Sequence, residues 1–238
     1  MSRGAGAAGG ELAALAARWG LDETARERLA VLVQRLSEDE LAPTSVRDAR
    51  AVVDQHLADS LAGLEVEGVA GAHEAVDLGS GAGLPGLVLA VALPETGFAL
   101  VESRREKCAY IASLAAALRL GNAGVRCTRA ESWREGIGRH DLALARALAP
   151  QAVVLEYAAP LLREGGRLVD WRGARDEEDE RAAERASEEL GMRRTALLAV
   201  EPFAGALHRH LHVFEKVEPT PAGFPRRAGI ARKRPLGR

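Results

Sequence analysis

A glycine-rich segment near residue 80 carries the residues best suited to hold a small ligand. It reads Asp77-Leu-Gly79-Ser-Gly81-Ala-Gly83-Leu84-Pro85-Gly86, and it follows a short apolar run. Glycine lets the backbone turn sharply and approach a ligand closely, and proline suits the first turn of a helix, where its missing N–H costs nothing. A tight connection alone does not need three alternating glycines, because each one costs backbone entropy. We therefore predict that a ligand lies across this turn.

The chemistry of that ligand is indicated by the acid before the turn. The spacing Gly81-x-Gly83-x-x-Gly86 fits the dinucleotide-binding pattern, which is weak evidence by itself. Asp77 would repel a pyrophosphate but attract a sulfonium and its amino group. A predicted hairpin near the end of the chain is also foreign to a plain dinucleotide-binding domain. Both features favour S-adenosylmethionine, with an NAD-linked oxidoreductase as the alternative.

Further polar residues follow the next predicted strands. Glu102 ends the second strand, where a carboxylate can accept hydrogen bonds from ribose hydroxyls. Ala130 and Glu131 follow the third strand and would flank an adenine, although a plain surface acid explains Glu131 equally well. Arg146 ends the fourth strand and could donate to a base or to the cofactor carboxylate, the alternative being a salt bridge. The carboxyl edge of such a sheet is the usual ligand crevice.

Two residues of the N-terminal region could brace this crevice. His56 and Asp59 lie on a predicted helix, and a buried histidine on a helix surface is an equally good interpretation. The two cysteines, Cys108 and Cys127, form no CxxC motif and have no histidine at ligand spacing. We expect neither a disulfide nor a metal site.

The pattern of apolar residues predicts how these positions are brought together. After Gly63, short apolar runs alternate with helical patterns, which is typical of βαβ units and a mainly parallel sheet. The strands are predicted at 75–78, 98–101, 124–127, 142–145, 167–171, 195–200 and 208–217, and the helices at 86–93, 105–118, 150–161 and 177–190. No helix separates the last two strands, so they must form an antiparallel hairpin at one sheet edge.

The chain divides into four regions by composition. Residues 1–10 are rich in Gly and Ala and are expected to be disordered, and residues 11–65 form a helical segment. Residues 72–218 form the ligand-binding α/β domain. Residues 219–238 form a basic tail with six cations and no acid, so that the net charge of −2 conceals −8 on the rest of the chain. The acidic run 176–189 is interpreted as a solvated helix face.

The tail suggests a polyanionic partner. Interleaved Pro and Gly with six cations fits a strap on RNA phosphates, and the competing account packs the tail against the domain as structure. No apolar run is long enough to cross a bilayer, and nothing resembles a secretion signal. We therefore expect a cytoplasmic protein with no membrane partner.

Several motifs together resemble the RsmG (GidB) family. They are the DLGSGAGLPG turn, His56-Leu-Ala-Asp59-Ser60-Leu61, the Ala130-Glu131 pair, Arg146 in ARALAP, and PTPAGFPRRAGIARKRPL at the end. The resemblance runs from about Val52 to the end of the chain. It implies a Rossmann-like S-adenosylmethionine-dependent methyltransferase that modifies guanine N7 in 16S ribosomal RNA, free or in the small-subunit particle. An RNA-binding module with a vestigial cofactor site is the non-enzymatic alternative.

The resemblance also assigns candidate site residues. The family's cofactor positions match Gly79, Leu84, Ala130, Glu131 and Arg146, and we add Asp77, Gly81, Gly83 and Glu102 on physical grounds. Arg146 is the candidate catalytic residue. The candidate RNA-binding residues are Arg172, Arg226, Arg227, Arg232, Lys233 and Arg234. The sequence departs from the family pattern at Arg172-Gly173, where Lys-Gly is usual, and at Arg105-Glu-Lys107, where a lysine pair is usual.

The expected chemistry needs no general base. Guanine N7 already bears an in-plane lone pair and no proton at neutral pH, so the enzyme mainly has to align donor and acceptor. The sequence has no Asn/Asp-Pro-Pro-Tyr after the fourth strand, the pattern associated with amino-group methylation, and no Pro-Cys nucleophile for carbon methylation. The N7 edge lies in the deep major groove of A-form RNA, so the target guanine must be unpaired or looped out.

Overall fold

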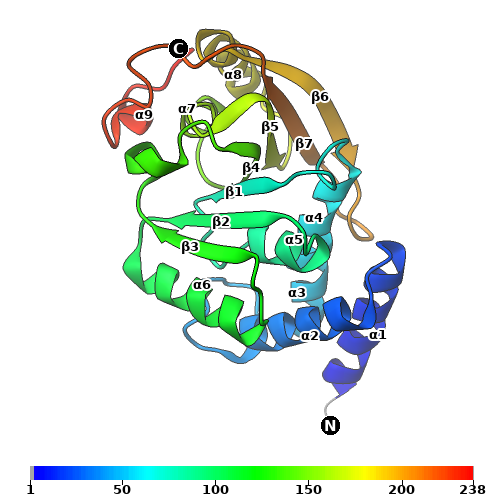
Figure 1. Cartoon of the computed structure of the whole chain (residues 1–238). Helices are drawn as coiled ribbons and strands as arrows, with labels where there is room; N and C mark the ends of the chain where they lie inside the picture. Colours follow the sequence, from blue (N-terminus) through cyan, green and yellow to red (C-terminus); the bar gives the residue numbers. More distant parts are fainter. Residues whose placement is uncertain (1–2, 238) are drawn as a thin grey trace.

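Seven strands form the central sheet of the computed structural model, which describes residues 3–237 and the side chains of residues 8–237 (Figure 1). They are β1 (Glu74–Leu78), β2 (Gly97–Glu102), β3 (Ala123–Cys127), β4 (His140–Arg146), β5 (Leu162–Arg172), β6 (Met192–Val200) and β7 (Arg209–Lys216). The order across the sheet is β3-β2-β1-β4-β5-β7-β6; β7 runs antiparallel to both β5 and β6, and the other neighbouring pairs are parallel. The predicted α/β sheet with its terminal hairpin is confirmed.

The register of the central strands places the predicted site residues at one edge. Asp77 of β1 pairs with Leu100 of β2 and with Leu144 of β4. The three strands are parallel, so their carboxyl ends lie side by side, where Glu102 ends β2 and Arg146 ends β4. This shared edge agrees with the expectation that the carboxyl ends of the parallel strands form the ligand crevice.

Helices cover both faces of the sheet. They are α5 (Gly86–Ala92), α6 (Arg105–Ala117), α7 (Gln151–Ala158) and α8 (Glu177–Glu189), with short 3₁₀ turns η3 (Ala130–Ser132) and η4 (Arg134–Gly136) after β3. On one face, Leu87 of α5 and Ile111 of α6 belong to a shared apolar core. On the other, Leu155 of α7 and Leu190 after α8 pack with Val76 of β1. Among the described residues, no helix has the length and apolarity needed to span a bilayer.

The N-terminal helices extend the core on the α5–α6 side (Figure 1). They are α1 (Arg3–Arg18), α2 (Glu23–Glu38), α3 (Ala49–Val52), the π-helix η1 (Val53–Ala58), α4 (Asp59–Leu61) and the 3₁₀ turn η2 (Ala62–Glu65). The side chain of Asp22 caps α2 by accepting from the Ala25 N–H at 2.7 Å. Leu29, Leu32 and Leu36 are fully buried in the same core as α5 and α6.

The first residues differ from the expectation of disorder. Helix α1 begins at Arg3, so residues 3–10 continue the helix, while residues 1 and 2 lie outside the described residues. The physical reason is not local propensity, because four of residues 3–10 are glycine, which disfavours a helix. The segment continues a helix whose Leu12 and Leu15 are buried in the core. Ala8 is also buried, so the segment has a packing partner.

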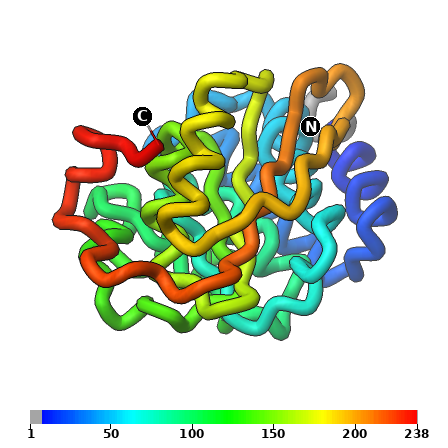
Figure 2. Tube along the Cα trace, turned by 90° about the horizontal axis from the view of Figure 1, so that it is seen from above, coloured from blue at the N-terminus to red at the C-terminus, as the bar shows by residue number. Residues whose placement is uncertain are grey.

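The basic tail packs against the domain. After β7 the chain returns along α7 and α8 and forms the short helix α9 (Ile230–Lys233), and Figure 2 shows this red segment beside the yellow-green trace. Ala231 and Leu236 are buried in the core that α7 and α8 share. A side-chain hydrogen bond holds the end of the tail, because Arg185 Nε of α8 donates to the Gly237 carbonyl at 2.7 Å. The structure therefore favours the competing account of a packed tail over a free strap.

The cysteines also differ from expectation. Cys108 in the first turn of α6 and Cys127 at the end of β3 form a disulfide. We expected no disulfide because the two cysteines form no CxxC motif, and they are nineteen positions apart in the sequence. The fold removes that separation: β2 and β3 are neighbours in which Glu102 pairs with Cys127, and α6 starts just after Glu102.

Candidate active site

The glycine turn has the left-handed backbone that its sequence predicts. Gly79, Gly81 and Gly83 have φ values of +66°, +59° and +87°, a region that side chains disfavour. A Cβ on Gly79 would overlap Leu148 Cδ1, whereas a Cβ on Gly81 would meet only the Gly79 carbonyl oxygen at 3.7 Å. Both the backbone conformation and the contact with Leu148 therefore require glycine at position 79, whereas at position 81 only the backbone conformation does.

The Asp77 side chain holds the end of the glycine turn by accepting a hydrogen bond from its backbone. Its carboxylate Oδ2 accepts a hydrogen bond from the Gly86 N–H at 3.1 Å, and the side chain is 1% exposed. Burial raises the pKa of Asp77 to about 6, against hydrogen bonds from Gly86 and Ser80 that favour the charged form. We expected Asp77 to face a sulfonium, but it lines none of the cavities described below. The tight approach of α5, whose Gly86 has no side chain, turns the carboxylate inward instead.

The first of two cavities at this edge has a volume of about 280 Å³ and gathers the predicted adenosine contacts. Its walls include Gly79, Glu102, Ser103, Ala130, Glu131, Leu148, Tyr157 and Arg232. The carboxylate of Glu102 is held in place by backbone N–H donors: Oε1 accepts from Ser103 and Arg104 at 2.7 and 2.9 Å, and Oε2 accepts from Gly81 at 3.2 Å. Glu131 is buried, not a surface acid.

The second cavity, of about 550 Å³, lies at the end of β4. Its walls include Thr44, His56, Asp59, Gly79, Gly81, Leu84, Lys107, Arg146, Trp171, Arg172 and Arg209. Arg146 Nη1 lies 2.9 Å from Asp59 Oδ2, and Arg209 Nε lies 3.6 Å from Asp59 Oδ1. The indole N–H of Trp171 donates to the Asp59 carbonyl at 2.8 Å. Arg146 therefore forms the salt bridge that the sequence offered as the alternative, and it also lines the cavity.

His56 is braced in its neutral form. Its Nδ1 donates to the Gln55 carbonyl at 3.1 Å, which leaves Nε2 to accept from the Thr44 hydroxyl at 2.8 Å. Burial, and then the charge of Arg146, lowers the pKa of His56. The residue lies on the π-helix η1, a distortion that is frequent at functional sites.

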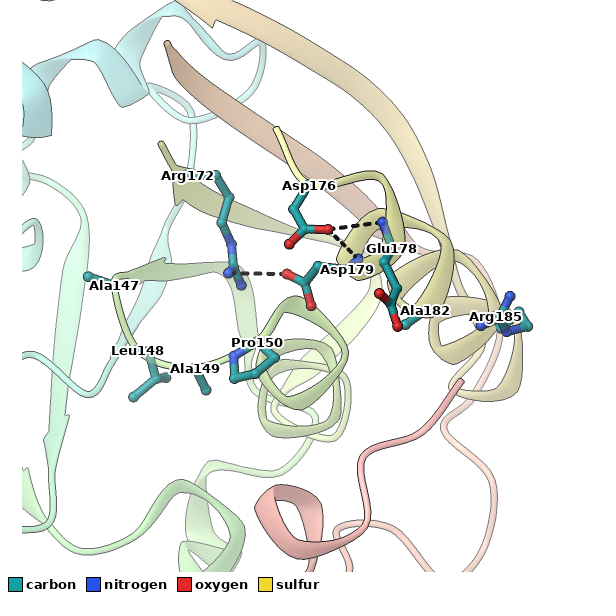
Figure 3. Close-up of a pocket in the computed structure, with 10 residues that line it drawn as sticks. All are labelled: Ala147, Leu148, Ala149, Pro150, Arg172, Asp176, Glu178, Asp179, Ala182 and Arg185. Carbon is teal, nitrogen blue, oxygen red and sulfur yellow. Dashed lines mark hydrogen bonds and ion pairs between the residues drawn. The ribbon is translucent and has the colours of Figure 1, made fainter. Parts of the chain in front are cut away.

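Arg172 lies between the second cavity and a third one. The third cavity has a volume of about 880 Å³, and Figure 3 shows the β4–α7 loop on one of its sides and α8 on the other. Arg172 Nε lies 2.7 Å from Asp170 Oδ2, and its Nη1 lies 3.5 Å from Asp179 of α8. Asp179 therefore forms an ion pair with the candidate RNA-binding residue Arg172, so the acidic helix is not only a solvated face.

The candidate RNA-binding cations of the tail fall into two groups. Arg226 forms an ion pair with the buried Glu156, and Arg232 lines the first cavity. Arg227, Lys233 and Arg234 have exposed side chains. The side chains of Arg227, Lys233 and Arg234 face solvent, and among residues 8–237 none of the side-chain hydrogen bonds or ion pairs uses them to hold the tail.

Sequence reasoning missed several residues of this edge. Arg209 and Thr44 reach the second cavity from β7 and from the loop after α2, and Tyr157 and the tail reach the first from elements distant in sequence. Nothing in the local sequence marks Thr44 or Tyr157. Arg209 was the one residue with a signal in the sequence, because it is a cation at the start of the strand predicted at 208–217.

The fold and this edge together define a Rossmann-like S-adenosylmethionine-dependent methyltransferase, with an antiparallel β7 between β5 and β6 and a glycine turn opposite an acid that ends β2. Solved structures agree on the fold. The mitomycin 7-O-methyltransferase MmcR aligns with a TM-score of 0.58 and 15% identity over 87% of this chain and 72% of its own. A mutant of MtNAS in complex with S-adenosylmethionine aligns with a TM-score of 0.55 and 16% identity over 80% and 74%.

The family is shown by sequence. The profile described as GidB, rRNA small subunit methyltransferase G, matches residues 26–211. Proteins called ribosomal RNA small subunit methyltransferase G are 38% identical in a Synechococcus species, over 82% of this chain and 78% of that protein, and 37% identical in Deinococcus radiodurans, over 91% and 88%. The chain belongs to the GidB family.

Proposed function

We propose that this protein transfers the methyl group of S-adenosylmethionine to N7 of a guanine in 16S ribosomal RNA. The observation that carries the proposal is the Arg146–Asp59 ion pair in the second cavity, where β4 ends. Methylation of an amino group is associated with Asn/Asp-Pro-Pro-Tyr after this strand, and methylation of a ring carbon with a Pro-Cys nucleophile; this chain has neither motif. A pair of this kind, in which Asp59 holds the guanidinium in place, can align the reactants, and alignment is sufficient for an acceptor that already has a free lone pair.

The residues of the first cavity fit the adenosine part of the cofactor. Glu102 would accept from the ribose hydroxyls, since its carboxylate is fixed by three backbone donors at the cavity wall. Ala130 and Glu131 would flank the adenine. Gly79 lines both cavities and would allow the sulfur to pass close to the backbone between them. When bound, S-adenosylmethionine supplies the methyl group of an in-line displacement.

The residues of the second cavity would position the guanine. Arg146 and Arg209 can donate to the guanine O6 or to the cofactor carboxylate and leave N7 free for attack. Asp59 lies between both guanidinium groups and would fix their orientation. With a lowered pKa, His56 stays neutral at pH 7 and adds no positive charge beside the sulfonium.

RNA would approach along the carboxyl edge of the sheet. The exposed cations Arg227, Lys233 and Arg234 remain candidates for phosphate contacts, whereas Arg172 is engaged by Asp170 and Asp179. A looped-out guanine fits the open second cavity better than a paired one. Ribosomal RNA as the substrate would place the reaction in the cytoplasm.

The test is mass spectrometry of 16S ribosomal RNA from a strain that lacks the gene. We expect one N7-methylguanosine to disappear and to return with the wild-type gene but not with a cavity variant. An unchanged modification pattern would refute the proposal. Melting temperature with S-adenosylmethionine and with NAD separates the oxidoreductase alternative, because only the true cofactor raises it. An RNA-binding module would bind RNA without incorporating methyl groups.

A further inference from the structure

The C-terminal tail closes one side of the first cavity. The Gly229 N–H donates to Glu131 Oε1 at 2.9 Å, at a point where Gly229 itself has a left-handed φ of +84°. Arg232 lines the same cavity, and its Nη2 donates to the Leu148 carbonyl at 2.9 Å. The tail therefore contributes both a backbone donor and a cationic side chain to the wall.

A buried ion pair fixes the tail in this position. Glu156 of α7 is 2% exposed, and its Oε1 accepts from Arg226 Nε at 2.7 Å while Oε2 pairs with Nη2 of the same guanidinium. Arg226 Nη2 also donates to the Arg234 carbonyl at 2.9 Å, which ties the two ends of the segment together. Release of the tail would leave the Glu156 carboxylate buried without this partner, which is strongly unfavourable.

We propose that residues 226–232 are a structural part of the cofactor site and form its wall at the adenosine end. Glu131, oriented by the Gly229 N–H, would accept from the exocyclic amine of adenine, which is a donor that a carboxylate suits. Arg232 is the positioning residue of the wall, since its planar guanidinium can stack on the adenine or donate to its ring nitrogens. The inference rests on the S-adenosylmethionine cofactor and is independent of the methyl acceptor.

The test compares two ligands on the full chain by calorimetry. S-adenosylhomocysteine contains the whole cofactor scaffold, and 5′-methylthioadenosine lacks the amino-acid end. Arg232→Ala should weaken binding of both ligands by the same factor, about tenfold, as for the loss of one hydrogen bond to a charged group. Lys233→Ala is the matched control, because Lys233 is an exposed cation on the same helix that lines none of the cavities. It should leave both affinities unchanged.

A second measurement does not depend on a substitution. Trypsin can cleave after Arg226, Arg227, Arg232 and Lys233, but not after Arg234, which precedes Pro235. S-adenosylhomocysteine should slow cleavage at these four sites of the wild-type chain. The proposal is overturned if Arg232→Ala binds both ligands as the wild type does, if it loses affinity for S-adenosylhomocysteine only, or if the ligand leaves tail cleavage unchanged. Both measurements compare cofactor-analogue binding with that of the wild type and use no RNA. A negative result would therefore refute the role of the tail without bearing on RNA methylation.

Discussion

Arg146 Nη1 and Asp59 Oδ2 lie 2.9 Å apart, and this pair joins the end of β4 to the N-terminal helices at the second cavity. The side chains are 14% and 7% exposed, so the pair is largely withdrawn from solvent. The arrangement makes the N-terminal helical segment part of the candidate active site. It also predicts that a substitution of Asp59 lowers the methyl-transfer rate more than it lowers binding of the adenosine part of the cofactor.

Asp59→Asn should lower kcat by about tenfold to a hundredfold, because a misplaced guanidinium misaligns donor and acceptor. The affinity for 5′-methylthioadenosine, which lacks the amino-acid end of the cofactor, should change little, since Asp59 does not line the first cavity. Single-turnover methylation and calorimetry measure the two effects. Asp54→Asn is the control on the same helical stretch, outside both cavities. Equal kcat values for Asp59→Asn and the wild type would contradict the positioning role.

Gly79→Val should abolish cofactor binding while the chain stays folded, and Gly79→Ala should weaken it strongly. A Cβ at this position would overlap Leu148 Cδ1, and Leu148 lines the first cavity. Gly81→Ala imposes similar backbone strain at φ +59° but has space for its Cβ, so it separates strain from blockage. Calorimetry should show that Gly81→Ala binds S-adenosylhomocysteine more tightly than Gly79→Ala does. The reverse order would show that strain alone sets the affinity.

Glu102→Ala should weaken cofactor binding by about 1–3 kcal/mol, the range for losing a hydrogen bond to a charged group. The same change also removes the acceptor of the Gly81 and Ser103 N–H groups, so the melting temperature should fall as well. Glu102→Gln keeps one acceptor and should recover part of both losses. Full affinity in an intact Glu102→Ala variant would exclude Glu102 from the site.

Asp77→Asn should change the pH dependence of stability. The pKa of Asp77 is raised in the folded chain from 3.8 to about 6, so its contribution to stability is present below pH 3.8 and is lost as the pH rises through about 6. The wild type should therefore lose about 3 kcal/mol relative to Asp77→Asn between these pH values. Urea unfolding at several pH values measures the difference. A difference that does not vary with pH would mean that the Asp77 pKa is ordinary.

The sequence predicted those features that depend on local pattern. Apolar runs such as the one before Gly79 give strands, and parallel strands bring Glu102 and Arg146 to one edge whatever the detailed packing. The glycine turn was predictable because a left-handed backbone needs glycine at Gly79 and Gly81.

The remaining features depend on contacts between distant parts of the chain. Arg226 and Arg227 are equivalent as letters, but only the first finds the buried Glu156. Asp77 was placed at the correct strand end, yet the direction of its carboxylate depends on how closely Gly86 of α5 packs against it. The disulfide likewise depends on the pairing of β2 with β3.

The most direct test of the central claim is methylation by the purified chain. The substrates are small-subunit particles and free 16S ribosomal RNA from a strain lacking the gene, with S-adenosylmethionine that carries a labelled methyl group. Digestion and mass spectrometry then identify the labelled nucleoside. We predict label in N7-methylguanosine at one position, and none with Gly79→Val. Label on an amino group or a ring carbon, or a chain that binds the cofactor but labels neither substrate, would contradict the account.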